Sequence, residues 1–142
     1  LSIVERNGRV KSFKLKDTKT QSVTDPIFDN VEPKSTVITD QYNGYFSLPY
    51  KFDHQKINHS KEEYVRGSVH TNTVEGYFSL LKRGIIGIYH QVSVKHLQRY
   101  CNEFDYRYNT RKIKDVERFE QAMGQAKNKR LTYAGLIKKV EN

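Results

Sequence analysis

Two carboxylates, Asp40 and Glu75, have the clearest chemical potential in this sequence of 142 residues. Asp40 ends a short apolar run, and Glu75 lies just inside a predicted helix, 35 positions later (75 − 40). Two neighbouring carboxylates repel each other unless a cation lies between them. Mg²⁺ binds to one or two carboxylates together with water and phosphate oxygens, and paired ions stabilise the attacking and leaving oxygens of a phosphoryl displacement. The pair therefore suggests metal-dependent phosphodiester chemistry.

Each carboxylate also has an ordinary structural interpretation. Asn72 followed three residues later by Glu75 is typical of a capping box at a helix start. Asp40 before Gln-Tyr-Asn-Gly is typical of a turn. Lys82 follows Glu75 by seven residues on the same helix face, about 10 Å away. There it would contact a phosphate or be a solvated charge. The residues by themselves leave both interpretations open.

The composition favours a polyanionic partner. The formal net charge is +9, and a basic surface gains affinity for nucleic acid by releasing condensed counterions. Arg66, His70, Arg83 and His90 surround the predicted helix and are candidates for lining a DNA groove, and Asn72 is a further candidate for a DNA contact. The five histidines lack a close paired spacing, which argues against a zinc site, and the single Cys101 excludes an internal disulfide.

Strands come first along the chain, and the first of them form a hairpin. Asn7-Gly8 predicts a tight two-residue turn within residues 1–15. The polar segment 16–34 has room for one short helix. Residues 35–40 are predicted as a strand that ends at Asp40, and residues 54–60 give a weaker strand signal. In open α/β sheets, ligands bind beyond the carboxyl ends of strands, which is where this pattern puts Asp40.

Helices dominate the second half of the chain. Apolar residues at helical spacing predict a helix over residues 70–84. A second helix is expected to begin with Ser93 as its N-cap. Residues 115–142 predict two shorter helices with a break near residues 127–130, the second capped by Thr132. The buried stripe of the first helix would consist of Val74, Tyr77, Phe78 and Leu81. No apolar run reaches membrane-spanning length.

Three stretches together resemble bacterial insertion-sequence transposases of the DDE class, in the group with the ISXO-like transposase domain. They are `TVITDQYNGY` at 36–45, the long block `YVRGSVHTNTVEGYFSLLKRG` and its continuation over 64–111, and `RLTYAGLI` at 130–137. The resemblance implies an α/β (α+β) fold of the ribonuclease-H type, a mixed sheet flanked by helices. Residues 1–110 would be the catalytic core, with residues 111–142 a helical extension packed on it.

The resemblance also implies roles for the candidate residues. Asp40 would be the second and Glu75 the third of three residues that bind two Mg²⁺ or Mn²⁺ ions. Lys82 matches a basic residue that contacts the transposon end. Some relatives use Asn or His as the third metal-site residue, which draws attention to Asn72 and His70. The first aspartate of the family lies on a strand upstream of the hairpin that these residues do not include, so we expect an unfilled sheet position and poor activity or none.

The resemblance thus predicts a transposase catalytic domain from a bacterial, cytoplasmic protein. It would cleave and join DNA at the terminal inverted repeats of an insertion sequence and at target DNA, as a homodimer or a larger synaptic assembly, with no membrane partner. The chemistry implied is metal-dependent hydrolysis and transesterification of phosphodiesters. The alternative is a truncated, catalytically inactive DNA-binding remnant, which the absent first aspartate supports.

Overall fold

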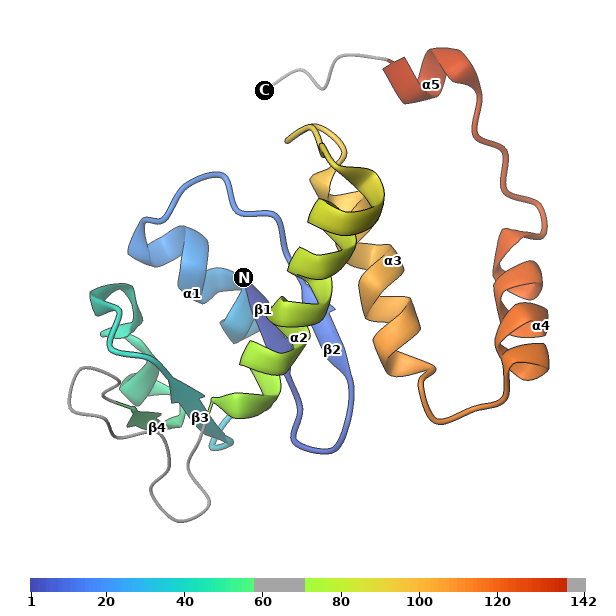
Figure 1. The fold of residues 1–142 in the computed structure, drawn as a ribbon. Coiled ribbons are helices and arrows are strands. Elements are labelled where there is room, and N and C mark those ends of the chain that lie inside the picture. Colours follow the sequence, from blue (N-terminus) through green and yellow to red (C-terminus); the bar gives the residue numbers. More distant parts are fainter. Residues whose placement is uncertain (58–70, 138–142) are drawn as a thin grey trace.

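The computed structural model describes residues 1–57 and 71–137, and the fold is mixed α/β (Figure 1). The strands are β1 (Ser2–Val4), β2 (Val10–Ser12), β3 (Thr36–Thr39) and β4 (Asp53–Lys56). The helices are α1 (Thr20–Asn30), α2 (Asn72–Gly84), α3 (Leu97–Asn109), α4 (Asp115–Ala126) and α5 (Tyr133–Ile137). Two 3₁₀ turns, η1 (Asn43–Tyr45) and η2 (Leu48–Tyr50), precede β4, and a π-helical turn, η4 (Ile85–Tyr89), continues α2.

The N-terminal hairpin is confirmed, with β1 and β2 antiparallel and Ser2 opposite Ser12. The predicted two-residue turn is wrong, because the Glu5 amide donates to the Arg9 carbonyl at 2.8 Å and residues 6–8 form the loop. Asn7 adopts a φ of 59°, which its short polar side chain tolerates.

The described strands form two separate two-stranded sheets instead of the single mixed sheet that we expected. β3 pairs with β4 in parallel, with Val37 opposite His54. The predicted strand over 54–60 is thus present as Asp53–Lys56, and residues 58–60 lie outside the described part. No described strand connects β1 with β3, so the two sheets remain apart.

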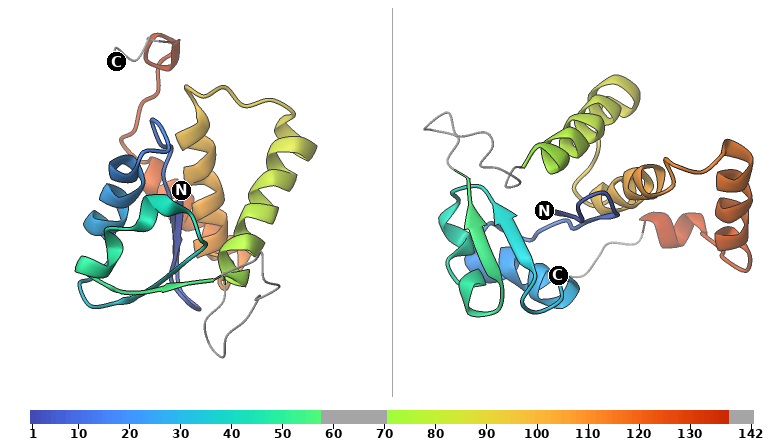
Figure 2. Two further views of the ribbon diagram at one scale, coloured as in Figure 1. Left: turned by 90° about the vertical axis from the view of Figure 1, so that its left-hand side faces the viewer. Right: turned by 90° about the horizontal axis from the view of Figure 1, so that it is seen from below.

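Two hydrophobic clusters lie on opposite faces of the hairpin. Leu1 and Ile3 pack against the cluster that includes Ile27 of α1, whereas Val4 packs against the cluster that includes Tyr77 of α2. This alternation is what a strand covered on both faces requires. Figure 2 shows α1 and α2 on opposite sides of β1 accordingly. The buried members are Val10, Tyr77, Leu81 and Phe104 in one cluster and Ile27, Leu48 and Phe52 in the other.

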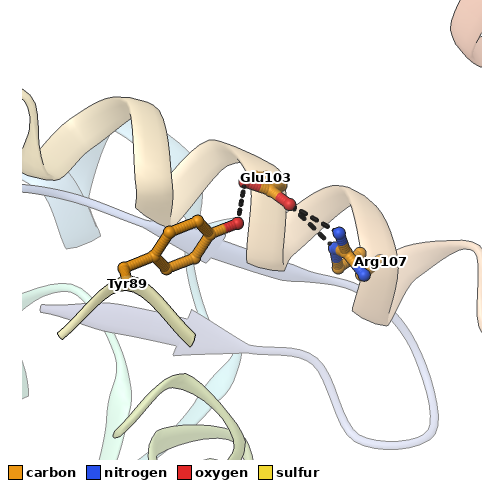
Figure 3. A network of polar contacts seen from close by, with 3 residues as sticks. All are labelled: Tyr89, Glu103 and Arg107. Carbon is orange, nitrogen blue, oxygen red and sulfur yellow. Dashed lines mark hydrogen bonds and ion pairs between the residues drawn. The ribbon is translucent and has the colours of Figure 1, made fainter. Parts of the chain in front are cut away.

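The helix between α2 and α4 starts later than the sequence predicted. α3 begins at Leu97 with His96 at the N-cap, so the assignment of Ser93 as N-cap is wrong. The Ser93 carbonyl instead accepts the His96 amide at 3.0 Å, in a turn that comes before the helix. The turn η4 is attached to α3 through the Tyr89 hydroxyl, which donates to Glu103 at 2.7 Å, and Glu103 in turn pairs with Arg107 (Figure 3).

The C-terminal segment contains the two predicted helices, α4 and α5. The predicted capping contact of Thr132 is also present, because the Thr132 hydroxyl accepts the Gly135 amide at 3.1 Å. None of the described residues of these two helices is buried. α4 contacts α3 where the Tyr106 hydroxyl donates to the Arg118 carbonyl at 2.5 Å. The division of the chain at residue 110 stays a prediction.

Candidate active site

Asp40 directly follows β3, as predicted, and its side chain is exposed. Its Oδ1 accepts the Tyr42 amide at 3.1 Å, so the turn contact proposed for this residue exists and uses one carboxylate oxygen. The preceding Thr39 hydroxyl donates to the Asp40 carbonyl at 2.8 Å. The strand end is therefore fixed on both sides of the carboxylate, which gives Asp40 a defined position.

Two side chains near the end of β3 have pKa values outside their ordinary ranges. Burial, and then the negative charge of Asp40, raise the pKa of Tyr45 to about 12. Burial, and then the positive charge of Lys56, lower the pKa of His54. His54 lies 2.9 Å from the Thr39 hydroxyl through Nε2. Tyr45 and His54 therefore remain neutral at neutral pH.

Glu75 lies in the first turn of α2 and is exposed. Its Oε1 accepts the Thr71 hydroxyl at 2.6 Å, and its amide donates to the Thr71 carbonyl at 3.1 Å. The N-cap is Thr71, and Asn72 is the first helical residue. The capping box with Asn72 as the cap is therefore wrong, because the helix starts one position before the pattern suggested. Glu75 is oriented by Thr71 instead.

Asp40 and Glu75 line the same cavity, which has a volume of about 1850 Å³. The cavity lies between the two sheets and is bordered by β1, β3, the start of α2 and one side of α3. A strand end and a helix start thus bring the two predicted carboxylates to the lining of one open cavity. Asp105 of α3 lines this cavity as well.

The edge of β1 that faces this cavity has no strand partner. Leu1 and Phe13 exchange two hydrogen bonds, at 2.7 and 3.0 Å, and Glu5 pairs with Arg9. In an antiparallel ladder the intervening residues point their amides and carbonyls the other way. The backbone groups of Ser2 and Val4 are therefore directed away from β2, and both residues line the cavity.

β3 presents a second edge of the same kind. The carbonyls of Ser35 and Thr39 accept the amides of Asp53 and Ile57, at 3.0 and 2.9 Å, in the parallel ladder with β4. The backbone groups of Thr36 and Ile38 alternate with these and point away from β4. Both residues line the cavity. Two strand edges without a described strand partner thus border the region that contains the candidate carboxylates.

The outer edge of β2 is different, because side chains of α3 occupy it. Asn109 accepts the Val10 amide at 2.7 Å and donates to the Val10 carbonyl at 2.9 Å. Gln98 donates to the Ser12 carbonyl at 2.8 Å and accepts the Lys14 amide at 2.7 Å. Asp105 accepts the Ser12 amide at 2.7 Å. These side chains therefore replace a neighbouring strand.

Asp105 is the centre of a buried network and is only 8% exposed. Besides the Ser12 amide it accepts the Ser12 hydroxyl at 2.7 Å and the Tyr77 hydroxyl at 2.5 Å. Burial, followed by the hydrogen bond to Asp105, raises the pKa of Tyr77 far above its usual range. Both oxygens of Asp105 are thus used to join β2, α2 and α3.

Sequence reasoning missed this role of α3. It predicted a helix with Ser93 as its N-cap but did not weigh the polar residues within that helix. The available signal was that Gln98, Asp105 and Asn109, at positions i, i+7 and i+11, lie on one helix face together with buried Cys101. Polar residues on a buried face must have hydrogen-bond partners, which is a reason to expect a strand edge there.

The residues predicted to contact DNA lie either on α2 or outside the described part of the chain. Lys82 and Arg83 are exposed in the last turn of α2, and Asn72 is exposed in its first turn. Arg66 and His70 fall in the segment 58–70, which is outside the described part, so their predicted roles are untested.

The donor set matches part of a magnesium site. Asp40 and Glu75 offer hard carboxylate oxygens, which Mg²⁺ prefers, and both line one cavity. Among the described residues there is no group of three or more His, Cys, Asp or Glu side chains that could hold a metal ion. The two carboxylates therefore fit one or two ligand positions, and further ligands would have to come from elsewhere.

A family model, the ISXO2-like transposase domain, matches residues 1–109. The match spans most of the chain, so the protein belongs to this family of insertion-sequence transposase domains, and the predicted resemblance is confirmed. No curated protein and no solved structure matches the chain. Among the described helices, none is long and apolar enough to cross a membrane.

Proposed function

We propose that this chain is the catalytic part of a DNA transposase that cleaves and rejoins phosphodiester bonds at the ends of an insertion sequence. Family membership supports the transposase function. The single structural observation that supports the chemistry is that Asp40, at a strand end, and Glu75, at a helix start, line one cavity. Its substrates would be the terminal inverted repeats and target DNA.

The ribonuclease-H-like sheet is part of this proposal. The edges of β1 and β3 both border the cavity, and an additional strand between them would join the two small sheets into one mixed sheet. A strand connected to Leu1 by a turn would run antiparallel to β1. We place the first catalytic aspartate on such an upstream strand, where its side chain would enter the region that Asp40 and Glu75 already border.

Asp40 and Glu75 would hold the metal, and the rest of the site would orient them. Mg²⁺ or Mn²⁺, as two ions in a complete site, would supply charge neutralisation and a more acidic water. The Tyr42 amide orients the Asp40 carboxylate, and the Thr71 hydroxyl orients that of Glu75. Lys82, two turns after Glu75 on the same face of α2, would hold a DNA phosphate next to the reacting one. Arg83 lies beside it.

The test is cleavage of a labelled DNA duplex that contains an element end. The protein would be the chain extended by its upstream strand, with and without Mg²⁺. Substitution of either carboxylate, Asp40→Asn or Glu75→Gln, should reduce the cleavage rate at least about 100-fold, because each removes a charged metal ligand. DNA affinity, measured by gel shift in the absence of metal, should stay within about twofold.

The matched control is Glu32→Gln, since Glu32 also lines the cavity and is exposed but has no proposed part in metal binding. Its cleavage rate should equal that of the unsubstituted protein. Cleavage that persists in Glu75→Gln, or that Glu32→Gln reduces equally, contradicts the assignment.

A second candidate is a DNA-binding remnant without catalysis. It is supported by the net charge of +9, which favours DNA binding whether or not a metal site is complete. Such a protein would compete with an intact transposase for DNA ends. Its DNA affinity would be insensitive to a chelator, and the extended chain would cleave no DNA under any metal condition.

A further inference from the structure

The end of β3 is joined to β4 by two consecutive side-chain hydrogen bonds. The Thr39 hydroxyl lies 2.9 Å from Nε2 of His54, and it donates to the Asp40 carbonyl at 2.8 Å. Thr39 is buried, with 8% of its surface exposed. The three residues thus form one continuous chain of hydrogen bonds from a side chain of β4 to the backbone of a candidate metal ligand.

The donors and acceptors around His54 determine which of its nitrogens has the proton. A hydroxyl has one hydrogen, and Thr39 uses it on the Asp40 carbonyl, so its oxygen can only accept from His54. Since burial lowers the pKa of His54, the imidazole is neutral and has a single N–H, which must be at Nε2. The opposite tautomer would leave a buried N–H at Nδ1, which has no hydrogen-bond partner among the described residues.

The ring of His54 also supports the turn that follows Asp40. Tyr45 packs edge-on against this ring, with ring centroids 6.4 Å apart, and Tyr42 packs edge-on against Tyr45 at 5.7 Å. The Tyr42 amide is the donor to Oδ1 of Asp40. His54 therefore supports Asp40 along two routes, through the Thr39 hydroxyl to the carbonyl and through two tyrosines to the carboxylate.

His54 itself lies behind the candidate site and does not border it. Thr39, Asp40 and Tyr45 line the large cavity, whereas His54 is not among its lining residues. It can therefore influence a metal ion there only through another residue. Hydrogen-bond partners behind a metal ligand orient that ligand, and their loss typically weakens metal affinity about 10–100-fold. His54 has the position of such a partner.

We propose that His54 is a positioning residue for Asp40, acting through the Thr39 hydroxyl with its own proton on Nε2. This inference rests on the proposed function, because it concerns the residues behind a carboxylate that would bind Mg²⁺ or Mn²⁺. His54 and Thr39 would hold the strand end in one conformation before the metal arrives, so metal binding would not have to order it.

The hydrogen-bond chain is tested first in the 142-residue protein, without metal or DNA. With ¹⁵N-labelled histidine, the chemical shifts of the two imidazole nitrogens identify the tautomer, and we expect the proton of His54 on Nε2. Its resonance should be protected from exchange with water, because the N–H donates to buried Thr39. Thr39→Val should abolish that protection.

The metal readout uses the chain extended by its upstream strand, titrated with Mn²⁺ alone, with the free ion measured by electron paramagnetic resonance. Thr39→Val and His54→Phe should each weaken Mn²⁺ binding about tenfold. Thr39→Ser keeps the hydroxyl and His54→Gln keeps an N–H donor, so both should bind nearly as tightly as the unsubstituted protein. Circular dichroism verifies that each variant is folded.

The matched control is Thr36→Val. Thr36 is also on β3, and its hydroxyl donates to Asp53 of β4 at 3.0 Å, but this contact is at the other end of the strand from Asp40. It should bind Mn²⁺ as tightly as the unsubstituted protein. Equal weakening by Thr36→Val and Thr39→Val overturns the proposal, because the loss would then come from any disturbance of β3.

The protein with both Thr39→Val and His54→Phe gives the sharpest readout. Because the two residues act in one chain, it should bind Mn²⁺ no more weakly than the weaker single variant. Additive losses overturn the proposal, as does unchanged Mn²⁺ affinity in both single variants or a proton on Nδ1 in the unsubstituted protein.

The same titration distinguishes this inference from the proposed function. If the extended chain binds Mn²⁺ in the expected pattern but cleaves no DNA, the proposed catalysis fails and the positioning role of His54 stands. If it cleaves DNA and loses activity with Asp40→Asn, but His54→Phe leaves Mn²⁺ affinity unchanged, only the positioning role fails. An extended chain that binds no Mn²⁺ overturns both.

Discussion

The two outer edges of the β1–β2 hairpin differ in the hydrogen bonding of their outward backbone amides and carbonyls. Along β2, three side chains of α3 bond the outward amides and carbonyls of Val10, Ser12 and Lys14. Along β1, the outward groups of Ser2 and Val4 face a large cavity. One edge is closed by a helix, and the other borders the candidate active site.

The difference shows which edge this fold can extend. An edge strand readily pairs with another strand unless something blocks it. Here α3 blocks β2 with three side chains that would have to move before any strand could add there. The edges of β1 and β3 have no such cover from a described strand, and they border the same cavity. Of the two outer edges of the hairpin, β1 is therefore the one that another strand can extend.

The largest effect is expected for Asp105→Ala, which removes the central member of the closed edge. The Ser12 amide, the Ser12 hydroxyl and the Tyr77 hydroxyl would all lose a buried charged acceptor. At roughly 1–3 kcal/mol for each buried group left unsatisfied, we expect a loss of about 3 kcal/mol or more in the free energy of unfolding. Urea denaturation measures it.

The control for this substitution is Asp115→Ala, since that carboxylate is 92% exposed and should change the free energy of unfolding by less than about 0.5 kcal/mol. Equal effects of the two substitutions would show that the α3 network does not hold the edge.

A smaller effect is expected for Asn109→Ala. It leaves both the amide and the carbonyl of Val10 without their partner on α3, and Val10 is buried. We expect a loss of about 1–3 kcal/mol in the free energy of unfolding, again measured in urea. Gln125→Ala is a suitable control, as Gln125 is exposed on α4. If Asn109→Ala and Gln125→Ala had the same free energy of unfolding, water would replace Asn109 and the β2 edge would not be closed by α3.

The smallest effect distinguishes the edges in the native state. Amide hydrogen exchange at Ser2 and Val4 should be at least about tenfold faster than at Val10 and Ser12, because only the latter amides donate to α3. In the chain extended by an upstream strand, Ser2 and Val4 should become protected, whereas Val10 should not change. Protection at Val10 alone in both proteins would contradict an added strand between β1 and β3.

Local patterns were enough for much of the fold and for the positions of the candidate residues. Asn7-Gly8 predicted a hairpin, the run before Asp40 predicted a strand, and the stripe around Tyr77 predicted α2. Each depends on neighbours within a few positions, where turn preference and periodicity act directly. Errors of detail, such as the loop length at residues 6–8 and the start of α3, arose at the ends of elements.

The sequence by itself determined that Asp40 ends a strand and that Glu75 enters a helix. Only the tertiary structure decided that both line one cavity, that the strands form two sheets with open edges, and that α3 closes β2. The contacts that make this difference join residues far apart in the chain, as between Val10 and Asn109, which are 99 positions apart. No local preference encodes such a contact, because it exists only after packing brings the two elements together.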